Sequence, residues 1–351
     1  MGVRAGFRYS LFSTTNLCQK SSNRNSIPNA KSIVLADDSV RIFEYKMNRE
    51  EILKAIDEKY QKLGIPVDAM LEGLLHGTPI TYWDYIQTDA LLGLQVQRTD
   101  YPDEMVFIMY HQVNELLFKM VLWEIDQVAK TPNVSAEKFS MHLMRISRYF
   151  DMLCSSFSVM ADGMELEQYL KFRNALTPAS GFQSAQYRKI EFASTELINL
   201  IDPRFRETIN RNSSFKNAYD HLYWRAAGMD RKTGEKSIFL KLFDEKYIGD
   251  FMEFMEDYDD CNLSKKFQEL PKEVQGNPEL IKAMRHYDYT VNVKWVMAHY
   301  NAAGKYLGGS DKELESTGGS SWRKYLHPKY QKRIFFPYLW NEDEIKNWGT
   351  F

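Results

Sequence analysis

Cysteine is scarce in this chain, and long apolar runs are missing. Only three cysteines occur in 351 residues, and Cys18, Cys154 and Cys261 lie far apart with no C-x-x-C pair. Such scattered thiols exclude a disulfide framework or a zinc-finger module and are typical of free cysteines in a reducing compartment. No apolar run reaches the length of a membrane-spanning helix, so we expect no membrane partner.

An excess of charge of either sign is missing as well. The 45 basic and 47 acidic residues leave a formal net charge of −2, and no long basic run occurs. Because a nucleic-acid-binding surface needs clustered Lys and Arg, we expect no nucleic-acid partner.

Several catalytic signatures are absent, and so is any convincing β-alternation. The sequence has no H-E-x-x-H or E-x-x-H pair, no G-x-S-x-G and no G-x-G-x-x-G. These absences exclude a zinc hydrolase, a di-iron bundle, a serine hydrolase with a nucleophile elbow and a dinucleotide-binding domain. The helical periodicity that remains predicts an all-α fold, built as a multi-helix bundle.

Residues 1–46 differ from the rest of the chain. The first acidic residue is Asp37, whereas basic and Ser residues are frequent before it. This composition is typical of an organellar transit peptide, but also of a disordered tail or of a chain whose native start is Met47. We therefore expect an N-terminal extension, 1–46, and one helical domain, 47–351, in a cytoplasmic protein unless the extension is a targeting signal.

Helical periodicity is strongest in the segment Tyr101–Lys130. Its apolar residues recur at spacings of three and four, and no Pro or Gly follows Pro102, which predicts a long amphipathic helix. A second apolar stripe, from Phe139 to Phe157, predicts another long helix with a core-facing side. This second helix is predicted over 134–162, and further helices over 47–63, 84–94, 165–176, from the 178–191 loop to about 200, 204–230, 234–258 and 279–306.

Three motifs have residue types suited to chemistry. In the first, Phe107 and His111 lie four positions apart and so share one helix face. A histidine beside an aromatic ring in mid-helix can reach a pocket between helices. From this helix alone, a core histidine bonded to a neighbour is the commoner case.

In the second motif, Arg173 ends a short polar helix seven residues before Ser180 and Gly181. A guanidinium near a glycine-containing loop is suited to holding a carboxylate through two parallel hydrogen bonds. Gly181 lets the backbone approach a ligand closely. The alternative is a surface ion pair of Arg173 with Glu165 or Glu167.

In the third motif, K-W-V-M-A-H ends at His299 on the last long helix, and S-T-G-G-S-S follows at 316–321. A neutral imidazole there can bind iron through Nε2 while its Nδ1–H donates to an acceptor. The alternative is again a core histidine. The loop lacks the G-K-[ST] ending of a phosphate-binding loop and is typical of a lid or a helix start over a pocket.

Together these stretches resemble the tryptophan 2,3-dioxygenase family. FIMYHQVNELLFKMVLWEID (107–126) is similar to the family's distal-haem helix, and PASGFQSAQYR (178–188) to its PASGFQSLQ(F/Y)R run. With the third motif they follow the family's order from about Ile80 to the C-terminus. The resemblance implies an all-helical protein that encloses haem b, ferrous when active, and assembles as a homotetramer, a dimer of dimers.

The resemblance also implies residue roles. His299 would be the axial iron ligand, His111 would bond the indole N–H of L-tryptophan, and Arg173 would hold its carboxylate. The implied reaction cleaves the indole C2–C3 bond with O₂ and puts both oxygen atoms into N-formylkynurenine, the first step of tryptophan degradation. The other implied contacts are Thr317 near the substrate ammonium, Phe107 and Tyr169 at the indole pocket, Tyr82 from the adjacent subunit, and Ser180 and Gly181 in the pocket lining.

The sequence departs from the family pattern at three places, one of which is the segment 1–46, which has no recognised counterpart in the family. Leu117 stands where the family usually has Trp, and the loop between His299 and Thr317 is longer, which puts lid closure in question. Two alternatives stay open. One is a superfamily haem enzyme that oxygenates another indole or aromatic amino acid, which the retention of Arg173, Thr317 and His111 disfavours. The other is a non-catalytic haem sensor.

Overall fold

The structure, a computed structural model, describes residues 48–176, 183–230, 233–307 and 327–350. Over these residues the chain forms helices and no strand, which confirms the predicted all-α class. Two isolated bridge pairs come nearest to a sheet. None of the described helices is both long enough and apolar enough to cross a membrane. The predicted extension, 1–46, lies outside the described residues.

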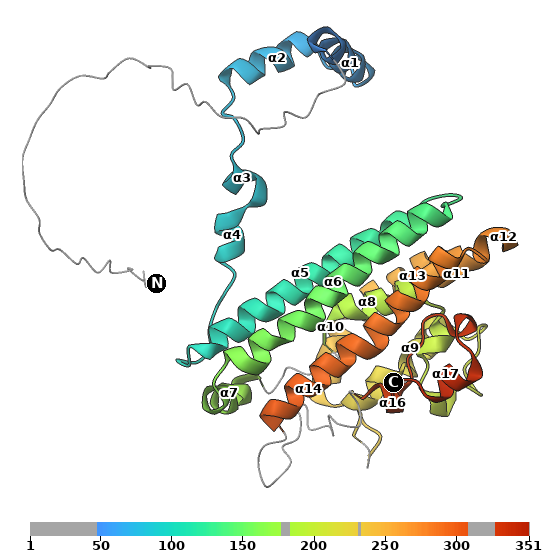
Figure 1. The fold of residues 1–351 in the computed structure, drawn as a ribbon. Helices are drawn as coiled ribbons and strands as arrows, with labels where there is room; N and C mark the ends of the chain where they lie inside the picture. Colours follow the sequence, from blue (N-terminus) through green and yellow to red (C-terminus); the bar gives the residue numbers. More distant parts are fainter. Residues whose placement is uncertain (1–47, 177–182, 231–232, 308–326, 351) are drawn as a thin grey trace, which may run out of the picture. The chain divides into compact units, whose positions relative to one another are not determined.

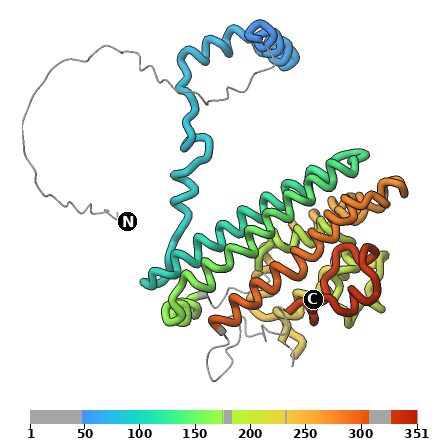
Figure 2. Tube along the Cα trace, in the orientation of Figure 1, coloured from blue at the N-terminus to red at the C-terminus, as the bar shows by residue number. Residues whose placement is uncertain are grey.

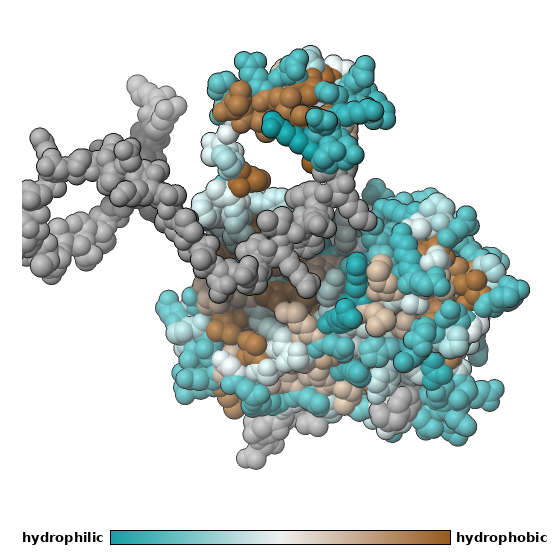
Figure 3. All heavy atoms as spheres, turned by 45° about the horizontal axis from the view of Figure 1, so that its top comes forward, coloured by the Kyte–Doolittle hydropathy of each residue, from teal (hydrophilic) through white to brown (hydrophobic). Residues whose placement is uncertain are grey.

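The chain divides into two units, Met1–Thr81 and Tyr82–Phe351. In the first unit, α1 (Arg49–Lys62) begins at a capping box in which Asn48 and Glu51 each accept the other's backbone N–H, at 2.9 and 2.8 Å. It packs on α2 (Val67–His76). Neither helix has a buried residue, and apolar side chains gather along one side of this segment (Figure 3).

Long helices form the bundle of the second unit (Figures 1 and 2). α5 and α6 lie side by side, α13 continues towards α14 along α6, and α8 packs on α5 and α10. The bounds are α5 (Asp103–Ala129), α6 (Ala136–Gly163), α8 (Ala185–Ser194), α10 (Ile238–Tyr258), α13 (Pro278–Tyr289) and α14 (Trp295–Leu307).

The apolar stripe of α6 forms the centre of the core. Spacings of three and four place its members on one face, where they meet buried side chains of α5, α8, α10 and α13. The predicted core-facing stripe is thus confirmed as far as residue 153, whereas Phe157, the next in the series, is only half-buried. The fully buried members are Phe139, Leu143, Ile146, Phe150 and Leu153.

Several predicted helices are interrupted. The helix expected over 84–94 splits into α3 (Tyr82–Ile86) and α4 (Thr88–Leu92) at Gln87, whose φ of 58° is left-handed. The helix expected to reach residue 200 stops at Ser194, and the residue after it is extended. The region 204–230 holds α9 (Phe215–Asp220) and 3₁₀ turns.

The physical reason in 204–230 is competition by short polar side chains, which bond the local backbone and so replace helical bonds. Asp202 accepts the N–H of Arg204, and Asn210 accepts that of Asn212, at 3.0 and 2.9 Å. The predicted helix over 279–306 is also broken, by the π-helical turn η5 (Thr290–Lys294). The shorter elements are α7 (Leu166–Phe172), η1 (Arg173–Leu176), η2 (Leu197–Leu200), η3 (Pro203–Phe205), η4 (Tyr223–Gly228), α11 (Leu263–Gln268), α12 (Lys272–Gln275), α16 (Pro328–Gln331), η6 (Pro337–Leu339) and α17 (Glu342–Lys346).

Candidate active site

His111 lies in the N-terminal half of α5. The start of this helix is fixed by Glu104, a buried carboxylate that accepts the backbone N–H groups of Arg98 (3.0 Å) and Thr99 (2.7 Å). Nδ1 of His111 lies 2.7 Å from the carbonyl oxygen of Phe107. Because a carbonyl oxygen only accepts, Nδ1 carries the proton, and Nε2 of the neutral ring is left as an acceptor.

His299 lies on the side of α14 that faces α6. The ring of Phe157 stacks on its imidazole with centroids 5.5 Å apart, and Trp295 lies at 6.0 Å. Burial, and to a smaller degree the nearby His111, lowers the pKa of His299 to about 4. Burial also lowers the pKa of His111, although its bond to Phe107 opposes the shift. Both imidazoles are therefore neutral at pH 7.

Both histidines are deep in the protein and still accessible. The surrounding atoms remove enough water to lower both pKa values, yet His111 is exposed and His299 only half-buried. Both the lowered pKa and the accessible surface are explained if protein atoms surround each imidazole but leave an open space along one of its sides. We infer that the two rings border a hollow within the bundle, which is where ligand sites in helical bundles occur.

A path of aromatic rings joins the two histidines. From His299 it runs through Phe157 to Tyr110, at 6.0 Å, and from Tyr110 to His111, at 5.7 Å. Phe107 packs on His111 with centroids 4.0 Å apart. The path involves α5, α6 and α14, so these three helices build one site.

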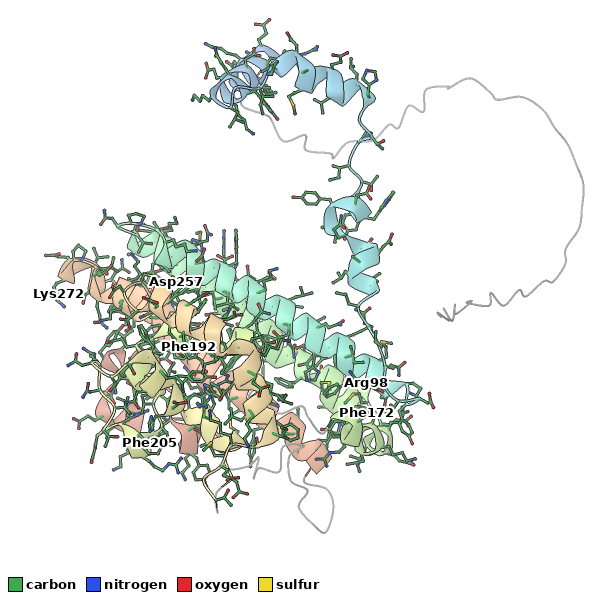
Figure 4. The ribbon with its side chains drawn as sticks, turned by 180° about the vertical axis from the view of Figure 1, so that it is seen from behind. Arg98, Phe172, Phe192, Phe205, Asp257 and Lys272 are labelled. Carbon is green, nitrogen blue, oxygen red and sulfur yellow. The ribbon has the colours of Figure 1, made fainter. Side chains whose placement is uncertain are left out.

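α7 is tied to the start of α5. The N–H of Asp103 donates to Oε1 of Gln168 (3.1 Å), and Oδ2 of Asp103 accepts the N–H of Glu165 (2.6 Å). At the end of α7, the fully buried Phe172 meets Phe107 edge-on at 5.8 Å. Figure 4 shows Phe172 and Arg98 at one end of the second unit and Asp257 and Lys272 at the other.

Arg173 directly follows this buried phenylalanine and is half-buried. Burial raises the pKa of Tyr169, and the charge of Arg173 opposes that shift, which places the two side chains close together. The surface ion pair considered above is not found among the described residues. Glu167 pairs instead with Lys171 at 2.7 Å, and Glu165 accepts the amide of its helix neighbour Gln168 at 3.0 Å.

Not all predicted site residues are brought together. Tyr82, on α3, is 72% exposed, and within the described part of the chain no hydrogen bond or ring contact links it to the histidines. Ser180, Gly181 and Thr317 lie outside the described residues. The residues that do meet at one end of the bundle are His111, His299, Phe107, Tyr169 and Arg173.

A buried cluster near α14 holds more positive than negative charge. Arg188 and Arg333 both donate to Glu191, at 2.7 and 2.8 Å, and all three side chains are buried. The hydroxyls of Tyr187 and Tyr223 add neutral partners. Two guanidinium groups and one carboxylate leave an excess positive charge away from water, which favours an anion nearby.

Two N–H donors beside this cluster, Nε of Arg188 and Nε1 of Trp295, are buried without an acceptor in the described part of the chain. The ring of Tyr187 lies 4.7 Å from that of Trp295 and 4.8 Å from the Arg188 guanidinium. Unsatisfied buried donors are uncommon. His299, neutral and only half-buried, suits the iron of a haem. The described residues therefore fit a haem.

Sequence reasoning missed three aromatic members of this site. Helical spacing places Phe157 in the core stripe, because nothing in the spacing distinguishes it from Leu153. Phe172 has no sequence signal except its place directly before Arg173. Tyr306, whose ring lies 4.6 Å from that of Tyr169, has no sequence signal except its place about two turns beyond His299 on the same helix.

Comparison with known proteins gives a consistent result. Residues 72–238 match the family model described as tryptophan 2,3-dioxygenase, a span that includes His111 and Arg173 and ends before His299. A protein named tryptophan 2,3-dioxygenase from Bacillus thuringiensis (strain Al Hakam) is 27% identical over 275 residues, which cover 75% of this chain and 91% of that protein. Another of that name, from Ruegeria sp. (strain TM1040), is 44% identical over 115 residues, 32% of this chain and only 40% of that protein.

Proposed function

We propose that this chain is a member of the tryptophan 2,3-dioxygenase family, whose model matches residues 72–238, and that it is a haem-dependent oxidoreductase acting on L-tryptophan. In the proposed reaction O₂ cleaves the indole C2–C3 bond and both oxygen atoms enter N-formylkynurenine, the first step of the kynurenine route. The observation that carries the proposal is the pair of neutral, accessible histidines His111 and His299, on two helices that both pack against α6.

In this proposal His299 holds the iron of haem b. Bound in the ferrous state, haem would supply the activation of O₂, and the protein supplies position and a site shielded from water.

His111 is proposed to orient the indole. Its Nδ1–H is engaged by the carbonyl of Phe107, so the lone pair of Nε2 faces the hollow as an acceptor for the indole N–H. Phe107 packs on this imidazole and holds its ring plane. A neutral His111 is required, because a protonated ring would have no acceptor to offer.

Arg173 and the residues around it are proposed to hold the amino-acid end of the substrate. Its planar guanidinium can pair with a carboxylate through two parallel bonds. Tyr169 and Phe172 form the wall beside it. The family resemblance alone adds three further contacts to the proposal. They are Thr317 near the substrate ammonium, and Ser180 and Gly181 in the pocket lining.

The outer face of α5 supports a homotetramer, proposed as a dimer of dimers. Spacings that alternate between four and three place five apolar residues in one exposed seam, a pattern typical of helix-to-helix packing between chains. A large exposed apolar patch is otherwise unfavourable in water. The seam residues, 41–67% exposed, are Met109, Val113, Leu116, Met120 and Trp123.

Tyr82 is proposed to complete the site of an adjacent subunit. Mixing an inactive His111→Ala protein with an inactive Tyr82→Ala protein should then restore part of the activity, since some sites would receive both native residues. The measurement is tryptophan turnover after dissociation and reassembly, with Tyr85→Ala, equally exposed on the same helix, as the matched control. Verified mixed oligomers that stay inactive would contradict a shared site.

The function itself is tested by supplying the reduced, haem-loaded protein with L-tryptophan and O₂. We expect N-formylkynurenine to accumulate and O₂ to be consumed in step with it. Binding of tryptophan without product would favour a sensor, and a hydroxylated indole would favour a different oxygenase.

A further inference from the structure

The helix that presents His299 contains one residue too many for an α-helix. α13 and α14 follow one axis (Figure 1), but between them η5 closes hydrogen bonds over five residues rather than four. The N–H of Trp295, for example, donates to the carbonyl of Thr290. Such a π-turn takes up an extra residue, and π-turns are frequent at functional sites.

The extra residue changes which side chains share a face. Tyr287 and His299 are twelve positions apart. In an unbroken α-helix, at about 100° per residue, their directions would differ by about 120°. With one residue absorbed by the π-turn, eleven steps remain and the difference falls to about 20°.

The observed contacts agree with the smaller angle. Tyr287 and Trp295 both pack on Phe150 of α6, with centroids 6.4 and 6.2 Å apart. His299 stacks on Phe157, two turns further along the same helix. All three side chains therefore face α6, although they lie on both sides of the π-turn.

The π-turn leaves polar groups unsatisfied. Oγ1 of Thr290 and Oδ1 of Asn292 are buried with no hydrogen-bond donor among the described residues. Buried oxygens of this kind destabilise a protein, so the arrangement persists only where surrounding contacts enforce it.

The strongest such contacts converge on Asp288, just before the turn. This fully buried carboxylate accepts Nδ2 of Asn292 across the turn, at 2.8 Å. It also accepts the N–H groups of Phe335 (2.9 Å) and Phe336 (3.0 Å) and Nε1 of Trp340 (3.0 Å). One side chain thus ties the π-turn to the C-terminal segment 333–340.

We propose that η5 takes up one surplus residue so that His299 keeps its direction towards the site, and that Asp288 is the positioning residue that holds this turn. The inference rests on the proposed function only in taking His299 as the residue that binds haem. The helical register that directs His299 towards the site does not depend on which substrate is oxidised.

Deleting Asn292 tests the register. Without the surplus residue, 278–306 can form an unbroken α-helix in which His299 still lies within about 20° of Tyr287. We expect ΔAsn292 to bind haem in the wild-type ratio, with a wild-type histidine-ligated spectrum, and to unfold cooperatively near the wild-type temperature. An ordinary helix would instead turn His299 away by about 100° on losing one residue, so a haem-free or unfolded ΔAsn292 protein would overturn the proposal.

An Ala inserted after Asn292 is the opposite variant. The turn has already absorbed one residue, so a second should rotate His299 out of the site, and we expect haem to be lost. An insertion variant with wild-type haem content would contradict the register argument.

The role of Asp288 is tested by a double-variant cycle with the iron–histidine stretching frequency of the ferrous protein as the readout. Asp288→Ala should shift this frequency in the wild-type background. In the ΔAsn292 background, which has no π-turn to hold, Asp288→Ala should change the iron–histidine stretching frequency little. Equal shifts in both would reduce Asp288 to a purely structural role. If the wild-type protein binds no haem, the proposed function fails, but the unfolding temperature of ΔAsn292, expected near that of the wild-type protein, still tests the register.

Discussion

Replacing His299 by Ala is expected to leave the purified protein almost without haem. In the described part of α14, His299 is the imidazole directed towards α6, and its pKa of about 4 keeps it in the neutral, iron-binding form well below neutral pH. Removal of the proposed iron ligand would leave mainly apolar packing to retain the cofactor. Haem per chain, measured by a pyridine haemochrome assay, tests this, and added imidazole should restore part of the binding.

His111→Ala is the matched control for this prediction. This residue is also neutral, but its proposed partner is the indole rather than the iron. We expect the variant to keep its haem and to lose most of its turnover. Full haem occupancy with an unchanged spectrum in His299→Ala would contradict the assignment, and loss of haem from His111→Ala would mean that the two roles are reversed.

Arg173→Leu is expected to remove the preference for L-tryptophan over tryptamine, which keeps the indole and the ammonium but has no carboxylate. A charge-assisted pair of hydrogen bonds contributes about 1.5–3 kcal/mol, or about 10–150-fold in kcat/KM. The wild-type protein should therefore prefer tryptophan by at least that factor, and the variant should lose activity on tryptophan while changing little on tryptamine. Arg173→Lys should recover only part of the loss, because an ammonium group cannot form the planar pair.

Lys171→Leu, which removes a positive charge two residues away, controls for general electrostatics. Lys171 pairs with Glu167 at the surface, so its loss should leave the substrate preference unchanged. The preference of each variant is measured as the ratio of kcat/KM for the two substrates, beside its melting temperature. If Arg173→Leu kept the wild-type ratio and only melted earlier, the guanidinium would be a structural group and not the reader of the carboxylate.

The sequence predicted the helical frame well because periodicity records burial on one face. The α6 stripe from Phe139 to Leu153 is core as expected, and His111 and Phe107 do share a face. Periodicity says nothing about depth, however. The property that distinguishes His111 and His299 from ordinary core histidines, low pKa values combined with accessibility, arises only when α5, α6 and α14 meet.

The π-turn could not be predicted for a related reason. From Asp288 to Val293 the chain is buried on nearly every side. An extra residue can be detected only where buried and exposed positions alternate with the helical period, and this segment has no such alternation. The buried cluster of Arg188, Glu191 and Arg333 was invisible as well. Its members are up to 145 residues apart in sequence (333 − 188), and helix spacing cannot relate positions on different elements.

The most direct test of the account is the fate of the two oxygen atoms. The reduced, haem-loaded protein would be given L-tryptophan under isotopically heavy O₂, and the product would be analysed by mass spectrometry before its formyl group can hydrolyse. The account predicts N-formylkynurenine carrying two heavy oxygen atoms, formed by the wild-type protein and not by His299→Ala. A product with one heavy atom and an intact indole ring, or no product from haem-replete protein, would contradict it.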